Sequence, residues 1–167
     1  MDATALATAM PAIQIHAGAA ILSFLLGTLV LLLKKGTRLH KAMGRVWVGL
    51  MVVVALSSFL ITEVRMFGPY SFIHALSIFT LVGLVQAIRA IRRGDVKAHR
   101  GTMIGLYGGA LILAGAFTLV PGRRMHAVLF ADGGWTALWV ALGFAGLVGA
   151  VLLVRRRVEG RAAALAR

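Results

Sequence analysis

Four histidines in this sequence have the residue type and spacing of metal or haem ligands. His16 and His74 lie in two copies of the triplet Ile-His-Ala, and His40 and His99 follow these copies, each after a pair of basic residues and a glycine. A neutral imidazole nitrogen binds haem iron, copper or zinc. Because the chain contains no cysteine, thiolate chemistry is excluded and histidine is the main candidate ligand.

The four histidines belong to a duplicated segment. The shared landmarks are Pro11, His16 and Lys34-Lys35-Gly36 in the first copy, and Pro69, His74 and Arg92-Arg93-Gly94 in the second. The apolar residues between these landmarks differ almost completely, whereas the spacing from proline to histidine to basic pair is the same. This pattern predicts a duplicated helical hairpin. The prolines suit the first position of a helix.

The composition is that of an integral membrane protein, since 60% of the residues are hydrophobic and 14% are charged. Apolar stretches of membrane-spanning length occur near residues 12–33, 44–62, 70–91, 102–120 and 135–154. We predict an all-α integral membrane fold with five transmembrane helices, the first four forming an antiparallel bundle. The expected segments are 1–11 (outer N-terminal segment), 12–62 (hairpin repeat 1), 63–120 (hairpin repeat 2), 121–134 (outer loop), 135–154 (helix 5) and 155–167 (basic cytoplasmic tail).

The basic residues indicate the orientation in the membrane. Of the 18 lysines and arginines, only Arg65, Arg123 and Arg124 fall in the loops on the side opposite the two dibasic stops and the tail. The positive-inside rule then predicts an inner membrane protein with its N-terminus outside and its C-terminus in the cytoplasm. The net charge of +13 is explained by topology and by attraction to anionic lipids, so the lipid bilayer is the expected partner and nucleic acid is not.

This topology sorts the histidines into an outer pair, His16 and His74, and an inner pair, His40 and His99. In an antiparallel bundle, helices 1 and 3 face each other diagonally, as do helices 2 and 4. A diagonal gap can admit a haem edge-on between two imidazoles, so we expect one or two b haems. Cations that suit haem propionates are Lys41, Arg45 and Arg100 near the inner pair, and Arg65, Arg123 and Arg124 on the outer side.

Two other functions stay open. The histidines would be interhelical hydrogen-bonding groups in a cofactor-free accessory subunit or small permease. Alternatively, His16 and His74, with or without His126, would form a copper or zinc site at the outer face. The glycines of helix 5 fit a homodimer, a larger membrane complex or packing within the chain.

Two resemblances follow from these residues. The Ile-His-Ala helix starts, the segments Leu39-His40-Lys41-Ala42-Met43-Gly44-Arg45 and Ala98-His99-Arg100-Gly101-Thr102-Met103, and Val120-Pro121-Gly122-Arg123 resemble the bacterial membrane protein family named domain of unknown function 2306. The pairing of one histidine per helix also looks like the di-haem cytochrome b561 type. That resemblance implies two b haems, held by His16 with His74 and by His40 with His99. It also implies a membrane electron carrier or oxidoreductase, for which we expect a quinol or small reductant as donor.

Overall fold

The described part of the chain is built from helices. The computed structural model describes residues 4–62, 68 and 70–165. Its helices are α1 (Thr4–Ala7), α2 (Pro11–Leu32), α3 (Arg38–Ser58), α4 (Phe72–Arg92), α5 (Val96–Gly105), the π-helix η1 (Leu106–Leu113), α6 (Ala114–Phe117), α7 (Arg124–Phe130) and α8 (Trp135–Leu165). Five stretches are long and apolar enough to cross a membrane: α2, α3, α4, the continuous segment Val96–Phe117, and Trp135–Leu153 of α8. The predicted all-α membrane fold with five spans is confirmed.

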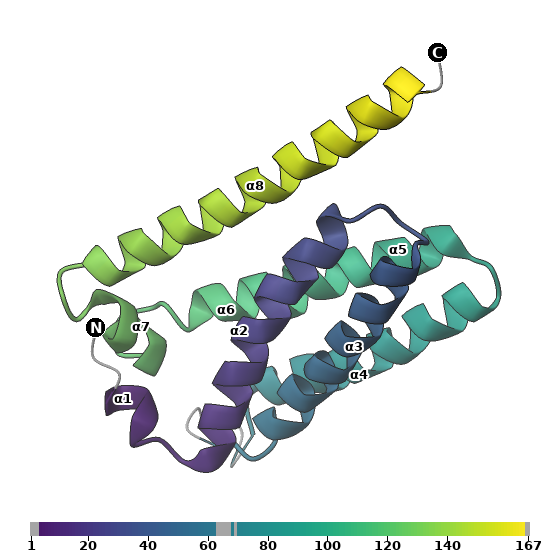
Figure 1. Cartoon of the computed structure of the whole chain (residues 1–167). Helices are drawn as coiled ribbons and strands as arrows, with labels where there is room; N and C mark the ends of the chain where they lie inside the picture. Colours follow the sequence, from purple (N-terminus) through teal and green to yellow (C-terminus); the bar gives the residue numbers. More distant parts are fainter. Residues whose placement is uncertain (1–3, 63–67, 69, 166–167) are drawn as a thin grey trace.

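Four of the spans form an antiparallel bundle (Figure 1). α2 packs on α3, α3 on α4 and α4 on α5, and η1 closes the ring by packing on both α2 and α4. α2 therefore faces α4 across the axis, and α3 faces the α5–η1 span, which is the diagonal arrangement that the repeat predicts. We call the end that holds His16 and His74 the outer end and the end that holds His40 and His99 the inner end, following the predicted orientation.

α8 lies outside the bundle (Figure 1). It packs on α2 and on α7, and the ring of Phe24 in α2 contacts that of Phe144 at 4.8 Å between centroids. The helix continues to Leu165, beyond the predicted end of the span at residue 154. The described part of the basic tail is therefore helical, since alanine and arginine have high helix propensity.

The glycine of each dibasic stop has a structural role. Gly36 and Gly94 have φ angles of 79° and 80°. Residues with a Cβ rarely adopt this left-handed conformation, whereas glycine does so without strain. The stop thus turns the chain between two antiparallel helices in both copies of the repeat.

The inner histidines lie within the first turns of their helices. Both helices begin earlier than the apolar pattern predicts, because polar caps extend them beyond the apolar stretch. The Thr37 side chain accepts the N–H of His40 at 3.1 Å, and Asp95 caps α5 in the same way. His40 is accordingly the third residue of α3 and His99 the fourth of α5.

The outer histidines occupy different positions in their helices. Pro11 is the first residue of α2, as predicted, and His16 is the sixth. The second copy departs from this pattern, since α4 begins at Phe72 and Pro69 lies outside the described residues. His74 is therefore only the third residue of α4, in the turn where backbone N–H groups lack helical partners.

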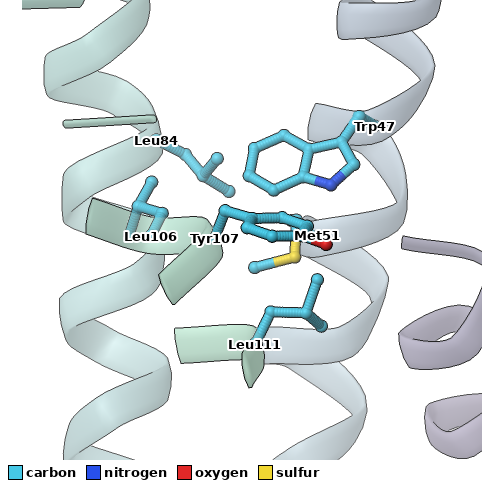
Figure 2. Packing of buried hydrophobic residues seen from close by; sticks show 6 residues of the cluster. All are labelled: Trp47, Met51, Leu84, Leu106, Tyr107 and Leu111. Atoms are coloured by element: carbon cyan, nitrogen blue, oxygen red, sulfur yellow. The ribbon is translucent and has the colours of Figure 1, made fainter. Parts of the chain in front are cut away.

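The centre of the bundle is filled by side chains from three spans. This core contains Trp47 and Met51 of α3, Leu84 of α4, and Leu106, Tyr107 and Leu111 of η1 (Figure 2). Half of it thus comes from a π-helix, a rare element that is frequent at functional sites. Along α3, Trp47 and Met51 follow His40 and precede the outer end, so the core separates the two histidine pairs.

Candidate functional site

The inner pair brings together two imidazoles from facing helices. His99 of α5 and His40 of α3 both lie in the first turns of their helices, at the same end of the bundle. The Nδ1 atom of His99 lies 3.0 Å from the carbonyl oxygen of Ala87. Because a carbonyl can only accept, Nδ1 carries the proton and the lone pair of the neutral ring is on Nε2. Metal-bound histidines show this same bond from the nitrogen that does not bind the metal.

In His40 the nitrogen available to a ligand is Nδ1, whereas in His99 it is Nε2. The Nδ1 atom of His40 is buried and has no hydrogen-bond partner among the described residues. A buried polar atom without a partner destabilises the fold, so such atoms in native proteins call for an explanation such as a ligand or water. Either ring nitrogen can bind a metal. The inner pair therefore offers one imidazole nitrogen from each of two facing helices.

The inner end is rich in cations. Lys35 interacts electrostatically with His40, and its ammonium group donates to the carbonyls of Val30 and Leu31 at the end of α2. The sequence analysis treated Lys35 only as part of a stop signal. Its position immediately before the glycine turn is the feature that could have placed it beside His40.

The three cations of the inner end that were predicted to pair with haem propionates have exposed side chains. Lys41 and Arg45 lie in the first two turns of α3. Arg100 and Lys97 line a groove on the exposed face of α5. These cations can reach an anion at the rim of the inner pair, but none of them is buried between the helices.

His16 joins α2 to α3 at the outer end. Its Nδ1 atom lies 2.9 Å from the carbonyl oxygen of Val54 and 3.1 Å from Oγ of Ser57. The carbonyl again requires a proton on Nδ1, which leaves the lone pair on Nε2. His16 thus combines an interhelical hydrogen bond with a nitrogen that could bind a metal.

His74 has the opposite tautomer. The backbone N–H of Ser71 donates to its Nδ1 atom at 3.1 Å, so Nδ1 holds the lone pair and Nε2 the proton. The side chain is only 5% exposed, and Nε2 has no partner among the described residues. The rings of Phe59 and Tyr70 lie against it, with centroids at 5.8 and 5.4 Å. His74 therefore caps α4 and buries a hydrogen-bond donor.

The remaining predicted residues of the outer side are Arg65, Arg123, Arg124 and His126. Arg123 stacks over the ring of Phe117 at 4.6 Å, Arg124 opens α7, and Arg65 lies outside the described residues. His126 stacks on Phe130 of its own helix, with centroids 5.0 Å apart. Within the described residues no three histidine or acidic side chains gather as a metal site, so the predicted copper or zinc site lacks a third ligand there.

Buried hydroxyl groups between the helices were missed by the sequence analysis. The Oγ atoms of Ser58 and Ser77 join α3 to α4 at 2.5 Å, and the hydroxyls of Thr28 and Tyr107 join α2 to η1. All four side chains are nine-tenths or more buried. The available signal was the occurrence of serine and threonine inside apolar spans, where such residues commonly bond across helices.

The comparisons place the chain in a family. No curated protein and no solved structure matches it. The profile of one family, described as "Predicted membrane protein (DUF2306)", matches residues 13–155, which include both histidine pairs and all five spans except the first two residues of α2. The protein belongs to the DUF2306 family of predicted membrane proteins.

Proposed function

We propose that this protein is a membrane electron carrier that holds one b haem at the inner end of the bundle, between His40 and His99. The observation that carries this proposal is the inner pair itself. Two imidazoles lie at the same end of facing helices, one with its lone pair on Nε2 and the other with a buried Nδ1 that lacks a partner among the described residues.

The residues at the inner end fit a haem in two further respects. The hydrogen bond from His99 Nδ1 to the Ala87 carbonyl fixes the tautomer and the orientation of the ring. The cations Lys35, Lys41 and Arg45 suit the anionic propionates. A bound haem would supply reversible one-electron chemistry at its iron. The protein's own part is to orient the imidazoles and to exclude water with the core that begins at Trp47.

The outer pair does not fit a second haem equally well. His16 has its lone pair on Nε2, but His74 has a proton there as long as the Ser71 N–H donates to Nδ1. Binding iron through His74 would require the proton to move and would leave the Ser71 N–H without its acceptor. We therefore restrict the proposal to one haem.

The orientation and the redox partner are part of the proposal. The excess of lysine and arginine at the inner end supports a bacterial inner membrane protein with its N-terminus outside. A quinol or another small reductant would donate the electrons. Reporter fusions to both termini test the orientation, since an N-terminus in the cytoplasm would exclude it.

The test is a reduced-minus-oxidised absorbance spectrum of the full chain in detergent, with a pyridine haemochrome assay to count haem per chain. We expect one b haem, lost in His40→Ala and in His99→Ala and retained in the matched control His126→Ala. Two haems per chain would extend the site to the outer pair. Protein that stays colourless after expression with ample haem would contradict the proposal.

A cofactor-free membrane subunit is the second candidate. The hydrogen bonds that two of the histidines make between helices favour it. His16 bonds α2 to α3 and His99 bonds α5 to α4, so each already has a role in helix packing. If this is the whole role, His99→Ala lowers thermal stability in a protein that never binds haem. The haem count and the melting temperature together distinguish the two candidates.

A further inference from the structure

A shallow groove with a cationic end runs along the exposed face of α5, beginning at the inner end of the bundle. It has a volume of about 550 Å³ and is lined by Val96, Lys97, Arg100, Gly101 and Ile104. The two cations lie nearer the start of the helix, and the glycine and isoleucine lie further into the membrane. Ile104 is 45% exposed, so the part of the groove beyond the cations faces the bilayer.

Glycines continue this face toward the middle of the span. Gly101, Gly105 and Gly108 are all exposed, and a Cβ atom at any of them would meet no heavy atom within 4 Å. Packing within the chain therefore does not explain them, in contrast to Gly27 and Gly83, where a Cβ would collide with core side chains. They leave a strip without side chains that begins where the two cations end.

The charge at the mouth of the groove selects an anion. Lys97 and Arg100 lie one turn apart on the same face, and Arg92 and Arg93 precede them at the end of α4. The nearest acidic residue, Asp95, accepts the N–H of Ala98 as the cap of α5. A ligand of this surface should therefore combine a negatively charged group with an apolar part.

We propose that the groove binds one anionic phospholipid. Its phosphate contacts Lys97 and Arg100, and one acyl chain lies over Gly101, Gly105 and Gly108. The direction of α5 fits a bound lipid, because the helix runs from the membrane boundary into the bilayer, as an acyl chain does. The length of this face fits as well, since the eleven steps from Lys97 to Gly108 rise about 16 Å at about 1.5 Å per residue, roughly half of a hydrocarbon core of about 30 Å.

A second copy of the chain is the other occupant that a glycine strip could admit. Two copies share one orientation in a membrane, so a symmetric contact along this face would bring Lys97 and Arg100 against their own counterparts. The repulsion of like charges at a low dielectric opposes that contact. A phospholipid with a negative headgroup instead neutralises both cations.

The test is native mass spectrometry of the full chain in detergent with added phosphatidylglycerol, phosphatidylcholine or inorganic phosphate. We expect phosphatidylglycerol to bind much more tightly than phosphatidylcholine. The variant Lys97→Ala/Arg100→Ala should weaken its binding on the order of 25-fold, from roughly five-fold per cation near a membrane surface. The control Arg92→Ala/Arg93→Ala removes the same charge outside the groove and should have a much smaller effect.

A second variant tests the acyl part separately. Gly101→Leu fills the groove without changing charge, and it should fold because the position is open and leucine has a higher helix propensity than glycine. We expect it to lose most phosphatidylglycerol binding. The proposal is overturned if this variant binds normally, if both lipids bind equally, if inorganic phosphate competes as well as lipid, or if the complex observed is a dimer without lipid.

Discussion

The backbone N–H of Ser71 donates to the Nδ1 atom of His74 across 3.1 Å, and this bond determines what His74 can do. Ser71 is the N-cap of α4 and His74 its third residue. At this position a side-chain acceptor commonly bonds back to the N-cap N–H, a role usually taken by glutamate or glutamine. The repeated histidine of the second copy therefore serves as a helix cap and carries its proton on Nε2.

His74→Ala should lower the stability of the protein without lowering its haem content. The variant leaves the Ser71 N–H without an acceptor, so we expect a loss of about 1 kcal/mol in the free energy of unfolding, as for other helix caps. His74→Gln keeps an acceptor at the third position and should recover most of this loss. Thermal unfolding in detergent followed by circular dichroism measures both.

The same pair of variants tests the two-haem interpretation. If His74 binds iron, both substitutions halve the haem per chain, and glutamine does not rescue it. A haem count that is unchanged in both variants while only alanine lowers the melting temperature supports the capping role.

The fold was predictable from the sequence because it depends on periodic and additive features. Apolar length determined the five spans, and the repeat with its dibasic glycine stops determined the antiparallel hairpins. Helix ends were less predictable. The extra turns that contain His40 and His99 depend on caps by Thr37 and Asp95, single hydrogen bonds that an apolar pattern does not record.

The candidate site was predictable only in part, for a related reason. The repeat identified the four histidines and the diagonal helices that carry them. It could not indicate which ring nitrogen is engaged, since the Ala87 carbonyl and the Ser71 N–H are backbone groups placed by helix packing and capping. Equivalent histidines in the two copies consequently have different tautomers.

Gly27→Ala should destabilise the bundle although alanine is the better helix former. A Cβ at this position would lie 2.5 Å from Nε1 of Trp47 and 2.7 Å from the Tyr107 ring, both of which are packed in the core. Overpacking of this kind typically destabilises by 1–3 kcal/mol, which exceeds the gain of roughly 0.5–1 kcal/mol in helix propensity. We expect a lower melting temperature.

The matched control is Gly18→Ala in the same helix. Its Cβ would meet nothing within 4 Å, so only the propensity gain remains and the melting temperature should stay the same or rise. Equal effects at the two positions would contradict the close packing of α2 on Trp47.

Tyr107→Phe should show how much the hydroxyl pair between α2 and η1 stabilises the core. The Thr28 hydroxyl donates to the carbonyl of Phe24 at 2.8 Å, so its oxygen is left to accept from the Tyr107 hydroxyl. Removal of that hydroxyl should lower the free energy of unfolding by about 1 kcal/mol, the usual net value of a hydrogen bond. Thr28→Val removes the acceptor together with the bond to the Phe24 carbonyl. Because the two single variants both remove the bond between Thr28 and Tyr107, the double variant should lose less stability than the sum of the two single losses.

Asp132 gives a stability contribution that depends on pH. It precedes α8, and the hydroxyl and the backbone N–H of Thr136 donate to its carboxylate and hold its pKa at about 2. The unfolded value is about 3.9. Because folding lowers this pKa, the bonds stabilise the protein fully above pH about 4, and the contribution is lost as the pH falls through about 2. Asp132→Asn removes the charge at every pH. We expect the wild type to melt above this variant at pH 5 to 7 and the difference to shrink toward pH 2; a difference that does not change with pH would contradict the role of the carboxylate.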